Sequence, residues 1–219
     1  MINDSIKKIK GLFPVTLKTF IKKFRNFNAD NKLDLKMLKY INYENGFFIE
    51  CGANDGINQS NTWYYEKKLN WRGVLIEPIP EVFDQLKKNR KSENLFFNNV
   101  LKSFKDKRKY IRLIYDKKDS LITKIESKKI KNTYSFRSRA KTLNEILTIS
   151  KAPKKIDFFS LDVEGDEINV LNGVDLKKYY FKYILIETIN LKKVINKLKR
   201  FDYKLKKKLS NIDYLFKKN

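Results

Sequence analysis

Acidic residues follow two short apolar runs in the first half of the sequence, and glycines gather around them. Glu50 comes directly after the apolar residues 47–49, and Glu77 comes directly after the run Val74–Ile76. Four of the seven glycines, at positions 46, 52, 56 and 73, lie in the same stretch. Acids at the carboxyl ends of parallel strands bind ribose hydroxyls, and glycine turns let the backbone approach a ligand. The stretch therefore predicts a nucleotide-binding unit of strand, loop, helix and strand.

The spacing of the glycines distinguishes between cofactors. A dinucleotide fingerprint needs glycines at positions 52, 54 and 57, but Asn54 and Ile57 occupy two of these positions. The observed order is Glu-x-Gly-x-Asn-x-Gly, in which asparagine tolerates the left-handed backbone of a middle glycine. This order is related to the loop of enzymes that bind S-adenosylmethionine (SAM). We expect the amino-acid part of SAM to contact Glu50, Gly52, Asn54 and Gly56, and its ribose to contact Glu77.

A second acidic group follows the nearly continuous apolar run Ile156–Val163, which is typical of a central strand buried on both faces. Asp162 ends this strand, and Glu164 lies two residues later. A hydroxyl group that accepts a methyl needs a base, or a metal ion that acidifies it. Because the chain has no histidine, Asp162 and Glu164 are the candidate catalytic residues, and the candidate ligands if a divalent metal takes part. Two alternatives stay open: Glu164 caps the next helix, and Asp162 only binds the amino group of the cofactor.

These two blocks of sequence resemble the FkbM-type SAM-dependent methyltransferases. The segments ECGANDG, SNT with the later Glu66, NWRGVLIEPIP and KKNRKS resemble the first signature of that family. The segment IDFFSLDVEGDE resembles the second, Asp-x-Glu-Gly-x-Glu, and the likeness extends from Gly46 to Phe216. The resemblance implies O-methylation of a hydroxyl on a sugar, a glycan or another small molecule. It also implies cofactor contacts for Pro78, which follows Glu77, and for Asn99, which lies where related enzymes place a polar residue beside adenine.

The order of apolar runs and helical segments predicts a doubly wound, seven-stranded α/β sheet of the Rossmann-like class I methyltransferase form, with one reversed strand. Residues 95–100 are expected to form the third strand, residues 183–186 a strand ending at Glu187, and residues 201–209 and 212–216 a closing antiparallel pair. Residues 116–141 show no clear periodicity. They are predicted to be either a substrate-recognition insertion or a surface loop.

The chain divides into residues 1–45, a basic amphipathic helical extension, and residues 46–219, the SAM-dependent methyltransferase domain. Residues 2–25 have apolar side chains at helical spacing among lysines, and residues 30–42 predict a second helix. The first segment is expected to pack on the domain or at an oligomer interface, with an acidic membrane surface as the alternative. Cys51, the single cysteine, is interpreted as a packing residue. With no transmembrane run and no signal peptide visible, the sequence predicts a cytoplasmic protein.

The formal net charge of +24 raises the question of a nucleic-acid partner. Only eight of the 49 basic residues are arginine, the residue that makes bidentate contacts to bases, so a solvated lysine coat is the favoured interpretation. Lysine and arginine are absent from residues 44–66, 73–86 and 156–176, which contain 13 of the 25 acids. An acidic lining suits the sulfonium cation of SAM. An RNA methyltransferase and a non-catalytic binding protein on the same fold are the alternative functions.

Overall fold

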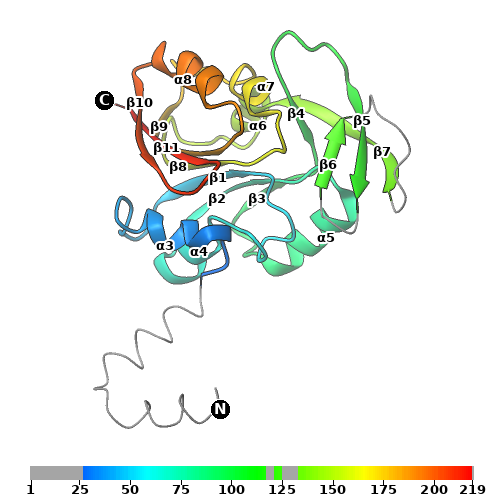
Figure 1. The fold of residues 1–219 in the computed structure, drawn as a ribbon. Helices are drawn as coiled ribbons and strands as arrows, with labels where there is room; N and C mark the ends of the chain where they lie inside the picture. The colour runs from blue at the N-terminus through cyan, green and yellow to red at the C-terminus, as the bar shows by residue number, and fades with distance from the viewer. Residues whose placement is uncertain (1–26, 117–120, 125–132, 219) are drawn as a thin grey trace, which may run out of the picture.

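The computed structural model describes residues 27–116, 121–124 and 133–218, so the helix predicted for residues 2–25 lies outside the described residues. A seven-stranded sheet forms its centre (Figure 1). Its strands are β1 Phe47–Cys51, β2 Arg72–Ile76, β3 Leu95–Phe97, β8 Lys155–Leu161, β9 Tyr180–Glu187, β10 Tyr203–Lys208 and β11 Asp213–Lys218.

The order of the strands across this sheet is β10-β11-β9-β8-β1-β2-β3. β3, β2, β1, β8 and β9 pair in parallel, whereas β11 is antiparallel to both β9 and β10. The predicted sheet of seven strands with one reversed strand is therefore confirmed. From β1 the chain builds outward first through β2 and β3 and later through β8 and β9, so the order switches between β1 and β8. Open α/β sheets bind ligands at such a switch, beyond the carboxyl ends of the strands.

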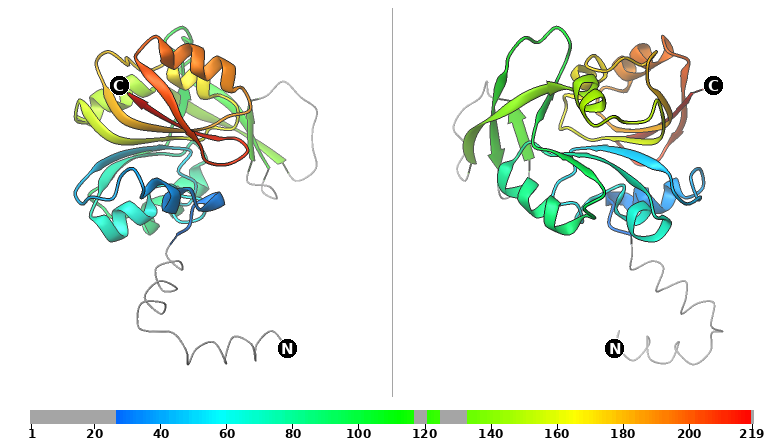
Figure 2. Two further views of the ribbon diagram at one scale, coloured as in Figure 1. Left: turned by 60° about the vertical axis from the view of Figure 1, so that its left-hand side comes forward. Right: turned by 180° about the vertical axis from the view of Figure 1, so that it is seen from behind.

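Helices cover both faces of the sheet (Figure 2). α6 Leu143–Ile149, α7 Glu167–Leu171 and α8 Leu191–Lys199 pack on one face, and α3 Leu33–Met37, α4 Trp63–Leu69 and α5 Pro80–Asn89 pack on the other. Side chains alternate between the two cores along each strand, as the two-residue period of a strand requires. In β1, for example, Phe48 faces the core under α3 and α4, and Ile49 faces the core under α6 and α8.

The described residues before β1, 27–46, pack into the domain. The predicted helix over residues 30–42 is shorter in the structure, where a 3-10 turn, η1 Asp30–Lys32, leads into α3. Asn31 and Lys32 have positive φ angles of 51° and 57°, which interrupt the helical path between the two. Leu33 and Met37 are nevertheless buried against the sheet, so part of the N-terminal segment belongs to the core. The boundary at residues 45 and 46 stays a prediction.

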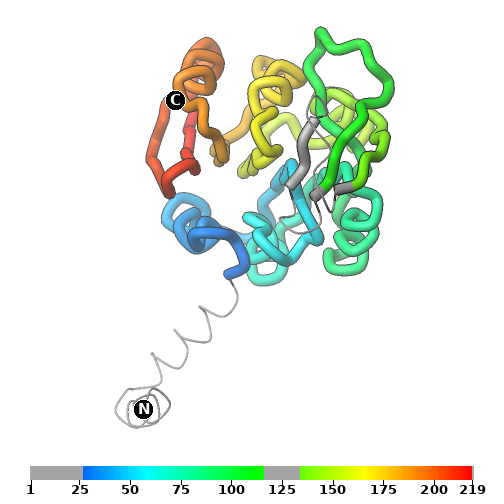
Figure 3. The backbone as a smooth tube through the Cα atoms, turned by 45° about the vertical axis from the view of Figure 1, so that its right-hand side comes forward, coloured from blue at the N-terminus to red at the C-terminus, as the bar shows by residue number. Residues whose placement is uncertain are grey.

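A second sheet of four strands stands beside the first (Figure 3). It contains β4 Val100–Lys102, β5 Tyr110–Asp116, β6 Leu121–Lys124 and β7 Thr133–Thr142, in the order β4-β7-β5-β6. Two expectations are wrong here. The strand predicted over residues 95–100 ends at Phe97, because Asn98 donates its side-chain amide to the Glu77 carbonyl at 2.9 Å and the chain then leaves the main sheet. The stretch predicted to be irregular contains β6 and the ten-residue β7.

β10 forms one edge of the main sheet, and Lys204 and the three lysines at positions 206–208 on it are exposed.

Cys51 is fully buried in the core, which confirms its interpretation as a packing residue. In the part of the chain that the structure describes, no helix is both long and apolar enough to cross a membrane.

Candidate active site

A cavity of about 350 Å³ opens at the switch point of the sheet, beyond the carboxyl ends of β1, β2 and β8. This volume is in the range of small-molecule sites, which begin at roughly 300 Å³. β4 and β5 of the second sheet supply one apolar wall. The lining residues are Gly52, Asn54, Gln59, Asn61, Ile76, Glu77, Pro78, Ile79, Asn99, Val100, Leu101, Leu113, Tyr115, Asp162, Val163, Glu164, Gly165, Asp166 and Val170.

The loop after β1 forms the floor of the cavity and depends on Gly52. Gly52 has a φ angle of +78°, and a Cβ atom there would lie 1.8 Å from the carbonyl oxygen of Asp162. The backbone N–H groups of Gly52 and Ala53 both donate to the carbonyl of Ile76 at 3.0 Å. Asn54 has a φ angle of 48°, which confirms the left-handed conformation predicted for it. The loop is thus held against β2 on one side and the loop after β8 on the other.

Glu77 is buried at the end of β2 and faces this loop. One of its carboxylate oxygens accepts the backbone N–H of Asn54 at 3.1 Å, and the other accepts that of Ile79 at 2.9 Å. Burial raises the pKa of Glu77 to about 7, although these two hydrogen bonds oppose the change. Each oxygen retains a second lone pair, so the carboxylate can accept two further hydrogen bonds from a ligand.

Asn99 and Pro78 lie on the wall formed near the second sheet. The side-chain amide of Asn99 donates to the carbonyl of Arg139 at 2.9 Å, which fixes the side chain against β7. Ile79, Val100 and Leu113 line the same cavity with apolar side chains. This end of the cavity suits a flat aromatic ring with a polar edge.

Two predicted cofactor residues, Glu50 and Gly56, do not line the cavity. The Glu50 carboxylate accepts hydrogen bonds from the Ser60 hydroxyl, from the Asn61 backbone N–H at 2.7 Å and from the Thr62 hydroxyl at 2.6 Å. It also pairs with the buried guanidinium of Arg90 at 3.3 Å. A Cβ atom at Gly56 would meet side-chain atoms of Leu86 and Arg90. Both residues therefore hold the loop and the following turn together beneath the cavity.

Gln59 and Asn61 line the cavity but were not among the predicted site residues. Asn61 is 7% exposed, and its side-chain amide donates to the Ser160 hydroxyl at 3.0 Å. Its side-chain oxygen is buried and has no hydrogen-bond partner among the described residues. The only signal in the sequence was the SNT segment within the family resemblance, since an isolated asparagine in a polar turn has no periodicity to mark it.

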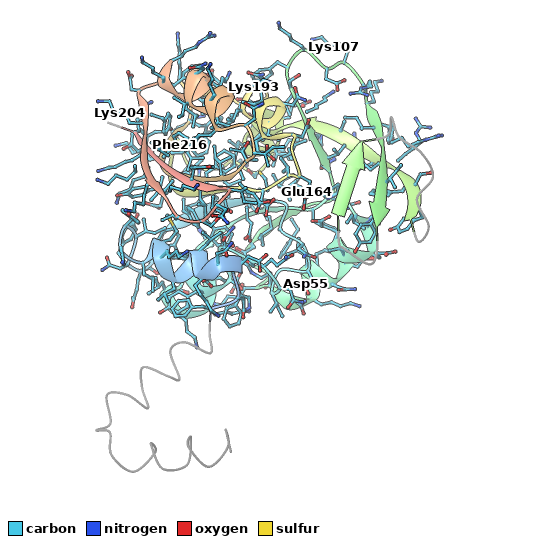
Figure 4. The ribbon with its side chains drawn as sticks, viewed as in Figure 1. Asp55, Lys107, Glu164, Lys193, Lys204 and Phe216 are labelled. Atoms are coloured by element: carbon cyan, nitrogen blue, oxygen red, sulfur yellow. The ribbon has the colours of Figure 1, made fainter. Side chains whose placement is uncertain are left out.

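Asp162 and Glu164 lie together at the cavity, on the loop after β8. Neither side chain makes a hydrogen bond or an ion pair with any described residue. Burial, followed by the charge of Glu187, raises the pKa of Asp162 well above its usual value. Glu164 is more exposed, but partial burial, followed by the charge of Glu167, also raises its pKa. In the view of Figure 4, Glu164 lies between the main sheet and the second sheet.

The structure bears on the alternative role of Glu164 as a helix cap. Asp166 is the N-cap residue of α7, and the carboxylate of Glu167 accepts the backbone N–H of Gly165 at 2.8 Å. Glu164 has a left-handed backbone with a φ angle of 52°, and Gly165 follows with +91°. This sharp turn leaves the Glu164 side chain exposed and outside the helix terminus.

The charge of the lining is one-sided. Among the described residues that line the cavity, four are acidic (Glu77, Asp162, Glu164 and Asp166) and none is lysine or arginine. No group of three or more carboxylates or cysteines within the described parts of the chain is arranged to hold a metal ion.

The strand order, the single reversed strand and a cavity at the switch point define a Rossmann-like methyltransferase of class I. The chain belongs to the family described as the methyltransferase FkbM domain, which it matches over residues 50–205.

Three solved structures have similar folds. They are an FkbM methyltransferase from Methylobacillus flagellatus KT (15% identity, TM-score 0.49, 92% of this chain and 58% of that chain), a ribosomal protein L11 methylase from Lactobacillus delbrueckii subsp. bulgaricus (9%, 0.46, 86% and 78%) and a methyltransferase from Geobacter sulfurreducens (12%, 0.44, 99% and 96%). The chain thus spans less than two thirds of the FkbM structure. No curated protein matches the chain.

Proposed function

We propose that the protein is a SAM-dependent O-methyltransferase that acts on a hydroxyl group of a sugar, a glycan or another hydroxylated small molecule. The observation that carries the proposal is the lining of the cavity, whose described residues include four acids and no basic residue in a chain with 49 lysines and arginines. A nucleotide cofactor with phosphate groups would need positive charge or free backbone N–H groups there. A cofactor with a sulfonium and an ammonium group fits the acidic lining.

The other features of the cavity are also compatible with SAM. Glu77 can accept hydrogen bonds from both ribose hydroxyls, because each carboxylate oxygen has one lone pair that is not used within the protein. Asn99, Pro78 and the apolar residues near them would contact the adenine ring. Gly52 lets the loop after β1, which would contact the amino-acid part, pack directly against the carbonyl of Asp162. When bound, SAM supplies a methyl group on a positively charged sulfur.

The residues of this chain would then position the acceptor and remove its proton. Asp162 and Glu164 have carboxylates without a hydrogen-bond partner among the described residues, and burial raises the pKa of both. A carboxylate with a raised pKa is a stronger base than one in water. Its pKa is also closer to that of the hydroxyl group from which it takes a proton. In this proposal Glu164 takes the proton and Asp162 lies beside the cofactor.

Calorimetry with SAM and its demethylated product S-adenosylhomocysteine (SAH), followed by a methyl-transfer assay, tests the proposal. We expect micromolar binding of both ligands and turnover with a hydroxyl acceptor from a panel of monosaccharides, glycans and hydroxylated small molecules. If the folded wild-type protein binds neither ligand, the proposed cofactor is wrong. If it binds them and methylates RNA but none of the panel, only the acceptor class is wrong.

A further inference from the structure

Among the described residues that line the cavity, Asn61 alone has a buried side-chain atom without a hydrogen-bond partner, its amide oxygen. Its residue lines the cavity and is 7% exposed, yet this oxygen accepts no hydrogen bond from any described residue. Leaving a buried acceptor without a donor costs about 1–3 kcal/mol. Such a group in a ligand cavity is expected to gain its partner when a ligand binds.

The rest of Asn61 is held firmly. Its backbone N–H donates to the carboxylate of Glu50 at 2.7 Å, and its side-chain amide donates to the hydroxyl of Ser160 at 3.0 Å. Ser160 lies on β8, two residues before Asp162, so the amide is anchored to the strand that ends at the cavity. With the amide nitrogen engaged by β8, the oxygen is the atom that remains to accept a hydrogen bond.

The surroundings determine what kind of donor fits. No described residue that lines the cavity is a lysine or an arginine, and Asp162, whose carboxylate is unpaired, directly follows the end of β8. A cationic donor is favoured by such a lining, and a ligand carboxylate is disfavoured. Among the groups of SAM, the ammonium of its amino-acid part combines positive charge with N–H donors.

We propose that the side-chain oxygen of Asn61 accepts a hydrogen bond from the ammonium group of the bound cofactor. This inference depends on the proposed function. It gives Glu50 a different role from the direct contact that its position in the sequence predicts: Glu50 and Ser160 orient Asn61, and Asn61 makes the contact. Glu50 and Ser160 are therefore positioning residues.

The test uses ligands that differ in the amino-acid part, measured by calorimetry with the full chain. SAH carries the ammonium and the carboxylate, decarboxylated SAM carries the ammonium alone, and methylthioadenosine carries neither. For Asn61→Ala we expect SAH and decarboxylated SAM to bind about 10- to 100-fold more weakly, the usual effect of losing a hydrogen bond to a charged group. The affinity for methylthioadenosine should stay within about two-fold of the wild-type value.

Two further variants control the result. Asn144, on α6, has the only other buried side-chain atom without a partner in the described residues, and it does not line the cavity. Asn144→Ala should therefore leave the affinities for all three ligands unchanged. Asn61→Asp keeps an acceptor at the same place, so it should bind SAH far better than Asn61→Ala does.

Three outcomes would overturn the inference. Equal weakening of all three ligands in Asn61→Ala would mean that Asn61 only shapes the cavity. Unchanged binding of SAH would mean that its oxygen accepts nothing from the ligand. Equal loss of SAH binding in the Ala and Asp variants would mean that the ligand contacts the amide nitrogen. Failure of the wild-type protein to bind SAM or SAH would instead reject the proposed function itself.

Discussion

Three carboxylates that line the cavity, Glu77, Asp162 and Glu164, have raised pKa values. Burial raises the pKa of Glu77 to about 7 and that of Asp162 well above its usual value. For Glu66, burial is outweighed by the buried guanidinium of Arg90, so its pKa is lowered. Raised values at a cavity are typical of groups that exchange protons or wait for a cation. The site is therefore chemically distinct from the ion pairs that stabilise the fold.

Replacing Glu164 by glutamine tests its role as a base. The change keeps the size of the side chain but removes its basicity, so we expect turnover to fall by about 10²–10⁴-fold. The affinity for SAH, measured by calorimetry, should change by only a few-fold. Normal turnover in Glu164→Gln together with loss of turnover in Asp162→Asn would transfer the role to Asp162. A chelator that abolishes the wild-type activity would indicate a metal ion at this place.

The affinity for SAH should depend on the ionisation of Glu77. Its carboxylate form accepts hydrogen bonds from the ligand, and its pKa is raised to about 7. Binding should therefore weaken as the pH falls through about 7, where the carboxylate becomes protonated. Glu77→Gln should bind SAH about 10-fold more weakly at pH 8, and its affinity should vary less between pH 6 and pH 8. A pH profile with the same slope in both proteins would rule out this assignment.

At the level of residues, strand ends were the reliable signal in the sequence. Glu77, Asp162 and Glu164 reach the cavity because each follows an apolar run that does form a strand. Glu50 follows such a run too, but the turn of residues 60–62 lies over it and Arg90 pairs with it from 40 residues away. A pairing over such a distance in sequence leaves no local pattern. The sequence therefore could not predict that Glu50 bonds to this turn and to Arg90 and does not line the cavity.

At the level of elements, the main sheet was predictable, whereas in the second sheet only the alternating residues 110–115, which form β5, indicated a strand. Most strands of the main sheet are apolar runs, whereas β7 has the polar sequence TYSFRSRAKT. Its residues do alternate, since Ser135, Arg137 and Arg139 are exposed while Ser138 and Ala140 are buried. On the inward face only Tyr134 and Phe136, both half-buried, carry a hydrophobic signal, whereas the fully buried Ser138 and Ala140 carry little. Its burial follows from pairing with β5 and β4, which are distant in the sequence.

Alanine substitutions at two glycines test how closely the loops after β1 and β8 approach each other. Both have positive φ angles, but a Cβ atom at Gly52 would meet the Asp162 carbonyl at 1.8 Å, whereas one at Gly165 would meet nothing within 4 Å. Gly165→Ala should lower the free energy of unfolding by about 1–2 kcal/mol, the cost of a left-handed alanine. Gly52→Ala should lower it by more than about 3 kcal/mol.

Urea denaturation of the two variants and the wild type measures these differences. Equal losses of stability would mean that the loop after β8 moves away from Gly52 without cost. Gly52→Ala should also weaken SAH binding, because the loop that forms the cavity floor must shift.

At the level of the whole molecule, the two signs of charge are separated. The lining of the cavity is acidic, whereas labelled lysines such as Lys107, Lys193 and Lys204 lie on the outside of the molecule (Figure 4). A cationic ligand is attracted to the cavity, but an anionic polymer would meet the outer lysines. Affinity for RNA is therefore a separate property from affinity for the cofactor, and it can be measured separately.

Binding of RNA should be weak and lose affinity steeply with salt, because it would rest on lysine–phosphate contacts alone. At about 0.2 M salt we expect a dissociation constant above about 1 µM and no methyl transfer to RNA. Titrations of a mixed RNA at several salt concentrations, with a methyl-transfer assay in parallel, measure both. Tight binding at the higher salt with methylation of the RNA would favour the RNA methyltransferase instead.

The row of exposed lysines on β10 has a consequence for how copies of the protein behave together. An unpaired sheet edge is a template for edge-to-edge aggregation, and charged side chains, lysine above all, prevent it. Two β10 edges that approach each other bring their lysines within a Debye length, which is about 10 Å at 0.1 M ionic strength. Colloidal stability should therefore fall when these lysines lose their charge. Mild chemical acetylation of the lysines is expected to make the edge strand β10 the site where fibrillar aggregation begins.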